Sequence, residues 1–138
     1  MITTEAPSHG EIQELEAEDL LTGQIIGAAI EVHRALGPGL LESAYEECLC
    51  LELGLRGLNF RRQVAIPIEY KGIKLDCAYA ADLIVNDEVI LELKAVEKIL
   101  AIHEAQLLTY MKLLRMKKGL LINFNTAVLK HGIRRRVL

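Results

Sequence analysis

Two different spacings of apolar residues along the chain predict helices and strands. Apolar residues recur at helical spacing over about 19–36, with the start at Asp19 or Thr22, and again over 40–53. Gly37-Pro38-Gly39 separates these segments, because glycine suits a left-handed helix cap and proline cannot continue a helix. The first part of the chain therefore contains two predicted helices.

The remainder of the chain predicts strands and one further helix. Alternating apolar and polar or small residues are typical of strands, and a turn at Tyr70-Lys71-Gly72 joins the first two. Buried or alternating runs predict the later strands, and helical spacing returns between them. The predicted strands are 59–69, 73–85, 89–94, 120–124 and 133–138, with the helix at 101–114. Mixed helices and strands of this kind indicate an α/β protein.

A β-hairpin is predicted in the middle of the sequence. Two short aliphatic runs flank Asn86-Asp87-Glu88, whose residues are typical of a turn between antiparallel strands. With a three-residue turn, Val85 lies opposite Val89 and Asp82 lies opposite Glu92. A two-residue turn would shift the register by one and separate the two carboxylates. The sequence favours neither turn strongly, and only the first brings the charged side chains together.

Asp82, Glu92 and Lys94 form the candidate site in the three-residue register. Glu92 and Lys94 share one face of their strand, because successive side chains alternate between faces. Two carboxylates and an amine flanked by apolar residues are costly to bury for structure alone. They suit a hard divalent cation, with the lysine beside a metal-bound water. The alternative is a solvated face of an antiparallel sheet.

Polar residues on the predicted helices give two weaker candidates. His103, Gln106 and Tyr110 lie on one stripe of the third helix, where they suit the orientation of phosphates or of a metal-bound water. The alternative is a plain solvated or half-buried helix face. His33 lies on or beside the apolar face of the first helix, a position more typical of a hydrogen-bonded core histidine than of a catalytic one.

Composition indicates one compact domain over residues 20–138. The chain has 138 residues, of which 51% are hydrophobic and 25% charged. Residues 1–19 include Pro7, Ser8 and Gly10 with six acidic side chains and no lysine or arginine, and they predict a flexible acidic leader whose residues 11–19 suit a frayed helical lead-in. No apolar run reaches membrane-spanning length and no signal peptide is evident, so we expect a cytoplasmic protein without membrane contact. The three cysteines form no Cys-x-x-Cys pair and are expected to be reduced.

The net charge of −3 is unevenly distributed. Without the acidic leader, residues 20–138 hold 16 basic and 13 acidic side chains, a net charge of +3. Arg134-Arg135-Arg136, in the last predicted strand, suits either a phosphate backbone or a solubilising sheet edge. The charge pattern permits a nucleic-acid partner without requiring one.

The order of elements, with an aspartate on the second strand and Glu-x-Lys on the third, resembles the PD-(D/E)XK nuclease superfamily. Gly39-Leu40-Leu41-Glu42-Ser43-Ala44-Tyr45 is similar to the signature of its GxxExxY family, and Gln106-Leu107-Leu108-Thr109-Tyr110 is similar to the Gln-x-x-x-Tyr motif of exonuclease-type members. The resemblance spans about 20–137 and implies a restriction-endonuclease-like core, an α/β fold with a mixed central sheet flanked by helices. Ala80 stands where many relatives carry an arginine, which removes one phosphate contact, and Ala81 replaces the proline of the superfamily's name.

The resemblance implies roles for the matched residues. Asp82 and Glu92 would bind Mg²⁺ or Mn²⁺, with the carbonyl oxygen of Leu93 as a further ligand. Glu42 would approach from its helix as an additional ligand or water-holder. Lys94 would orient or deprotonate the attacking water and stabilise charge on the phosphate.

Gln106 and Tyr110, with His103 on the same stripe, would support this site. The implied chemistry is metal-assisted hydrolysis of a phosphodiester by in-line attack of water. We therefore expect a metal-dependent nuclease or nuclease-like protein that acts on nucleic acid, with DNA favoured over RNA. A homodimer is one way to grip a duplex, because a small core alone offers little surface. The alternative class is a non-catalytic module that retains the nuclease fold and binds nucleic acid or protein.

Overall fold

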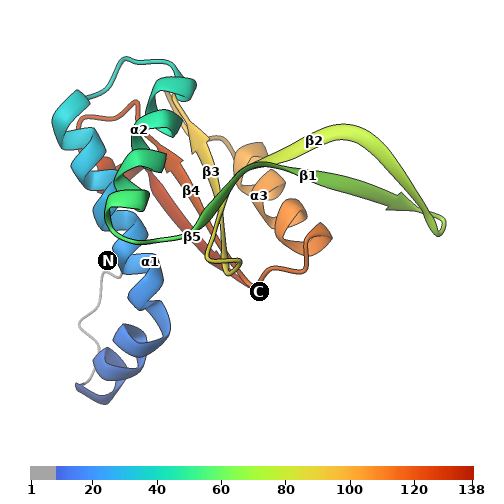
Figure 1. Cartoon of the computed structure of the whole chain (residues 1–138), viewed down its shortest axis with the longest axis horizontal. Coiled ribbons are helices and arrows are strands. Elements are labelled where there is room, and N and C mark those ends of the chain that lie inside the picture. The colour runs from blue at the N-terminus through green and yellow to red at the C-terminus, as the bar shows by residue number, and fades with distance from the viewer. Residues whose placement is uncertain (1–8) are drawn as a thin grey trace.

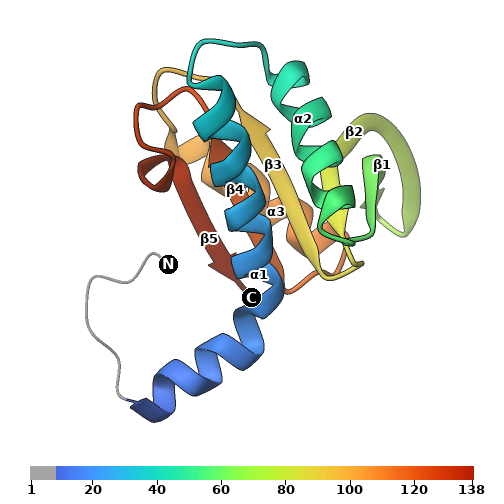
Figure 2. The ribbon, with the colours of Figure 1, turned by 60° about the vertical axis from the view of Figure 1, so that its left-hand side comes forward.

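The computed structural model describes residues 9–138, with side chains from residue 20 onward. In this part of the chain, a five-stranded sheet of order β1-β2-β3-β4-β5 separates three α-helices into two layers (Figure 1). Helices α1 (His9–Leu36) and α2 (Glu42–Leu55) pack on one face of the sheet, and α3 (Ala101–Leu113) packs on the other (Figure 2). The predicted α/β fold, with its restriction-endonuclease-like mixed sheet flanked by helices, is confirmed.

Of the four strand pairings in the described sheet, three are antiparallel and one is parallel. Strands β1 (Phe60–Tyr70), β2 (Ile73–Val85) and β3 (Val89–Lys94) form an antiparallel meander. Strand β4 (Lys118–Asn123) lies parallel to β3, and α3 supplies the crossover that a parallel pair needs. Strand β5 (Ile133–Val137) returns antiparallel to β4. These bounds match the predicted strands to within two residues, and the 3₁₀ turn Leu129–Gly132 has no predicted counterpart.

Helix α1 begins earlier than its apolar pattern predicts. The expected start was Asp19 or Thr22, whereas the helix begins at His9 and includes the acidic segment. Glutamate, leucine and alanine in this segment favour helix, and acidic residues near a helix N-terminus interact favourably with its dipole. Residues 1–8 of the predicted leader lie outside the described residues. No described helix has the length and apolarity needed to cross a bilayer.

Tyr45 anchors the loop between α1 and α2. Its hydroxyl donates to the carbonyl of Gly37 at 2.6 Å and accepts from the amide of Leu40 at 3.2 Å. Its ring stacks on Phe124 with the centroids 4.5 Å apart, and the side chain is fully buried. Gly37 and Gly39 have φ values of +69° and +103°, which glycine adopts without strain. The last residue of Gly-x-x-Glu-x-x-Tyr therefore fixes the loop that precedes α2.

Each face of the sheet has its own apolar core. The larger core joins α1 and α2 to the sheet, and the smaller core joins α3 to Ile66, Ile84, Ile90 and Leu121. Gly119 in β4 allows α3 to lie close, because a Cβ at this position would be 2.6 Å from the Met111 sulfur. The close packing of α3, which carries three candidate residues, thus depends on glycine at position 119 of β4.

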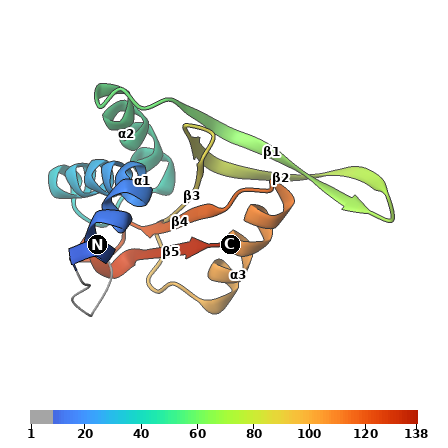
Figure 3. The same ribbon diagram turned by 90° about the horizontal axis from the view of Figure 1, so that it is seen from below.

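Strand β2 extends far beyond its partner β3. The two strands pair only over Leu83–Val85 and Val89–Leu91, whereas β2 pairs with β1 along almost its whole length. The outer part of β1 and β2 therefore leaves the body of the domain as a two-stranded ribbon, which we call the arm, residues 64–81 (Figures 1 and 3). The candidate site lies where the arm begins.

Candidate functional site

Asp82 lies at the point where β2 diverges from β3. The hairpin has the three-residue turn, with Val85 opposite Val89, and Asn86 and Asp87 adopt φ values of +52° and +54°. The last pair in the ladder is Leu83 with Leu91, so Asp82 and Glu92 are the next facing residues. Oδ2 of Asp82 accepts a hydrogen bond from the amide of Leu93 at 2.8 Å. The aspartate side chain thus takes a backbone donor that β2 no longer pairs.

Glu92 is almost completely buried beside Asp82, with 4% of its surface exposed. Burial, together with a hydrogen bond to Asp82 and the charge of Asp82, raises the pKa of Glu92 to about 9, and the Lys94 ammonium opposes this shift in part. Oε1 of Glu92 is buried without a hydrogen-bond partner among the described residues. At neutral pH the metal-free pair therefore retains one proton, and one carboxyl oxygen has no partner.

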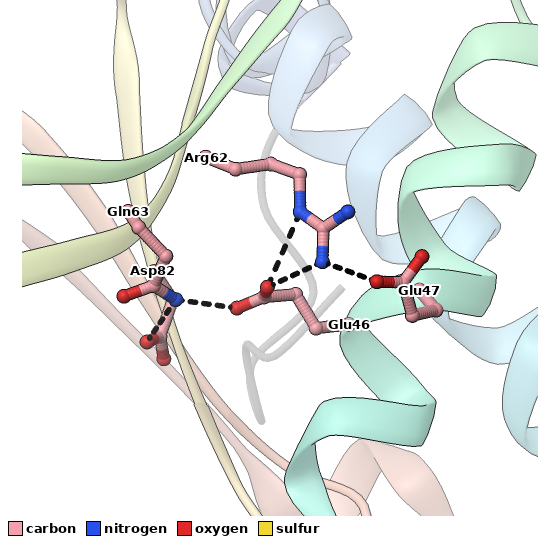
Figure 4. A network of polar contacts seen from close by, with 5 residues as sticks. All are labelled: Glu46, Glu47, Arg62, Gln63 and Asp82. Atoms are coloured by element: carbon pink, nitrogen blue, oxygen red, sulfur yellow. Dashed lines mark hydrogen bonds and ion pairs between the residues drawn. The ribbon is translucent and has the colours of Figure 1, made fainter.

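A polar network connects Asp82 to helix α2 (Figure 4). Nε2 of Gln63 donates to Oε1 of Glu46 at 2.8 Å and lies 3.3 Å from Oδ1 of Asp82. Arg62 donates through Nε and Nη2 to Oε2 of Glu46, at 3.2 and 2.8 Å, and through Nη2 to Glu47 at 2.8 Å. Gln63 has a φ of +48°, an uncommon conformation for a residue with a side chain. The network brings a third carboxylate, that of Glu46, to the edge of the site.

Glu42 is exposed in the first turn of α2 and makes no hydrogen bond or ion pair within the described chain. Glu46, one helical turn further on, is the residue linked to Asp82. The i, i+4 spacing places both glutamates on one face of α2, but only the structure shows which turn reaches the site. The sequence interpretation gave no role to Glu46, Gln63 or Arg62.

The three polar residues predicted to share one face of α3 do not all lie at the candidate site. Tyr110 is buried, and its hydroxyl accepts from Nε2 of Gln106 at 3.0 Å. Burial and then the charge of Glu92 raise the pKa of Tyr110, so its hydroxyl stays protonated at neutral pH. Nδ1 of His103 instead accepts from the amide of Leu100 at 3.0 Å, which places this histidine at the N-terminal end of α3. Gln106 and Tyr110 thus lie together beside Glu92, and His103 caps the helix.

The other two candidates lie elsewhere in the fold. Nε2 of His33 is 2.7 Å from the carbonyl oxygen of Thr126, so this buried histidine has the hydrogen-bonded core position that its helix face indicated. The arginines of β5 line the sheet edge opposite β1. Arg136 pairs with Glu104 of α3, and Arg134 donates to the carbonyls of His131 and Ile133.

The donor set at Asp82 and Glu92 fits a hard divalent cation. Carboxylate and carbonyl oxygens are the ligands that Mg²⁺ and Mn²⁺ prefer, and the unpartnered Oε1 of Glu92 is available as a ligand. Within residues 20–138, no group of three His, Cys, Asp or Glu side chains is close enough to hold a metal ion. In this structure the ligands of such a cation would therefore be the carboxylates of Asp82 and Glu92, the carbonyl oxygen of Leu93 and water.

The chain was compared with known families, curated proteins and solved structures. A family model described as the PD-(D/E)XK nuclease superfamily matches residues 19–136, which is most of the 138-residue chain. No curated protein and no solved structure matches. The matched range contains every candidate residue described above.

Proposed function

The chain belongs to the PD-(D/E)XK nuclease superfamily, and from that premise we propose that it is a metal-dependent nuclease that hydrolyses phosphodiester bonds, of DNA in preference to RNA. The observation that carries the proposal is the buried Glu92 beside the half-buried Asp82 at the divergence of β2 and β3, with Lys94 two residues after Glu92. Holding a proton on this pair at neutral pH destabilises the folded state. A structural role alone would not compensate for that loss of stability.

The carboxylates of Asp82 and Glu92, with the Leu93 carbonyl, would hold Mg²⁺ or Mn²⁺. When bound, the cation supplies positive charge at the phosphate and makes water a stronger nucleophile. Lys94 would orient the attacking water and neutralise charge that develops on the phosphate as the bond to the leaving oxygen breaks. Glu46, linked to Asp82 through Gln63, is a better placed additional ligand than the exposed Glu42.

Within the superfamily, we assign the chain to the GxxExxY family. The support is the role that Gly39-Leu40-Leu41-Glu42-Ser43-Ala44-Tyr45 has in the fold. Glu42 is the first residue of α2, and the Tyr45 hydroxyl holds the preceding loop through Gly37 and Leu40. The spacing of this motif thus sets the direction in which α2 presents Glu46 to Asp82.

Gln106 and Tyr110 would support the site rather than act on substrate. The amide of Gln106 fixes the tyrosine hydroxyl, whose raised pKa keeps it a hydrogen-bond donor near the carboxylates. Cys48, Cys50 and Cys77 are all free, which suits the reducing cytoplasm that we expect for this protein.

The deciding experiment compares metal binding and cleavage in the same variants. Mn²⁺ and Mg²⁺ are titrated by calorimetry into wild type, Asp82→Ala and the control Asp87→Ala. Asp87 belongs to the same hairpin but is exposed at the turn, where it pairs with Arg61. Each protein is then incubated with labelled single- and double-stranded DNA and RNA.

We expect Asp82→Ala to lose metal binding and cleavage together and to remain folded, because removing one of two adjacent acids relieves their repulsion. Asp87→Ala should behave as wild type. Metal binding without cleavage of any of the four substrates would instead support the non-catalytic binding module. A wild type that binds neither ion would refute the metal site and leave only the fold.

A further inference from the structure

One face of the arm carries three pairs of facing apolar residues, and the strand register shifts between Ile66 and Ile68. In the β1–β2 ladder Ile66 faces Tyr79, Ile68 faces Leu75 and Tyr70 faces Ile73. Alternate residues of β1 share a face, so these six side chains lie on the same side of the ribbon. The opposite side carries the pairs Ala65–Ala80 and Glu69–Lys74. The arm is thus an amphipathic ribbon.

Helix α3 covers only the inner end of this apolar face. Ile66 is fully buried against the core residues of α3, and the Tyr79 ring meets the Tyr110 ring edge-on with the centroids 6.0 Å apart. Beyond that point the side chains emerge into solvent. The exposed fractions are 46% for Tyr79, 44% for Leu75, 63% for Ile73 and 61% for Tyr70. Figures 1 and 3 show the arm extending past α3 with no other described element against it.

The uncovered apolar face is as large as the largest apolar patch of a typical monomer, and patches of that size are often interaction sites. The four side chains expose on the order of 400 Å², which is in the range of the largest apolar patches on monomeric proteins. A ribbon of two strands is also only marginally stable in water without a covering layer. A symmetric contact between two such faces would bury on the order of 800 Å² from these side chains alone, half of a standard interface.

We propose that the apolar face of the arm packs against the same face of a second copy of the chain. Both β1 and β2 contribute apolar side chains to this face. A two-fold axis that passes through the contact would set the two ribbons face to face, as in aligned sheet packing. The polar sides of both ribbons would stay in water. This contact does not depend on the proposed nuclease activity.

The charges of the arm argue against nucleic acid as the occupant. Binding to a phosphate backbone requires cations, and none of the six residues of the apolar face is itself cationic. Lys74 lies on the opposite side, facing Glu69, and Lys71 at the turn has its ammonium 5.5 Å from the centre of the Tyr70 ring.

Sedimentation equilibrium of three proteins tests the proposal. Wild type should form a dimer of twice 15.4 kDa. Ile73→Asn/Leu75→Asn removes four apolar side chains from a symmetric contact and should raise the dimer Kd at least about 100-fold. Lys74→Asn places the same residue on the opposite face of the same strand and should leave the Kd unchanged. Circular dichroism verifies that each protein is folded. If the double variant does not fold, Tyr70→Ser takes its place.

Several results would overturn the proposal. A wild type that is monomeric at about 100 µM would exclude a physiological self-contact. A dimer of unchanged Kd in the double variant would place the contact elsewhere, and dissociation of Lys74→Asn as well would exclude the apolar face as its basis. A monomeric wild type whose affinity for labelled DNA falls in the double variant would make nucleic acid the occupant.

Discussion

Replacement of Glu92 by glutamine should stabilise the metal-free protein, and the gain should increase with pH. The glutamine amide has nearly the same shape and can still donate to Asp82, but it cannot ionise. Glu92 has a pKa of about 9 in the fold against an ordinary value of 4.5. Below pH 4.5 the carboxyl is protonated in both folded and unfolded chains, so it contributes no pH-dependent cost. Between these two values only the unfolded chain releases the proton, and stability falls as pH rises.

The magnitude follows from the width of this window. Each pH unit between 4.5 and 9 removes about 1.4 kcal/mol of stability from wild type and nothing from Glu92→Gln. The variant should therefore be more stable by less than about 1 kcal/mol at pH 5 and by about 3 kcal/mol at pH 7. Above pH 9 the carboxyl is ionised in both states, and the difference should become constant.

Urea unfolding at several pH values from 5 to 8.5, in the presence of a chelator, measures this difference directly. The matched control is Glu97→Gln, because Glu97 follows the same strand and its side chain is exposed to water. A gain that does not change with pH, or a loss of stability at every pH, would refute the description of Glu92 as a buried, protonated carboxyl. Added Mn²⁺ should then stabilise wild type, by about 2.7 kcal/mol at 100 times its Kd, and stabilise Glu92→Gln much less.

Three further predictions concern other parts of the molecule. Lys94→Ala should retain Mn²⁺ binding in calorimetry and lose at least about 100-fold in cleavage rate, and loss of metal affinity instead would make Lys94 structural. Tyr45→Phe should cost about 1–2 kcal/mol in urea unfolding, because the carbonyl of Gly37 loses its donor while the stack on Phe124 remains, and an unchanged midpoint would contradict this. Gly119→Ala should cost about 1–3 kcal/mol, because the new Cβ meets Met111, Leu107 and Ile90, and a stabilised variant would show that α3 can move away.

The sequence predicted the hairpin because its turn residues carry a local signal, but it left the register open between a two- and a three-residue turn. Asn86 and Asp87 tolerate the positive φ values that they adopt in this turn, and the aliphatic runs on both sides define the strands. Once Val85 faces Val89, strand alternation alone brings Asp82 to Glu92. Neighbours in sequence therefore limited this half of the site to two registers, and the structure shows the one that brings the two carboxylates together.

The other half depends on contacts between distant elements. Gln63 meets Glu46 across 17 residues and Asp82 across 19, and nothing in the sequence around Gln63 indicates its φ of +48°. Spacing placed Glu42 and Glu46 on one face of α2, but the rotation of that helix is set by the Tyr45 anchor, which was recognisable in the sequence only as part of a motif. Glu42 was chosen from the resemblance, and the packing favours Glu46.

The arm and the site arise from one feature, the divergence of β2 from β3 after Leu83. Were the strands to stay paired, the Leu93 amide would bond to the β2 backbone, and Asp82 would have no donor beside Glu92. Because they separate, Asp82 takes the amide and β2 continues outward with β1 as the arm. The direction of the arm is therefore coupled to the position of Asp82. If two arms pack together, they restrain β2 at this point, so a monomeric arm variant should bind Mn²⁺ more weakly than the wild-type dimer although no ligand has been changed.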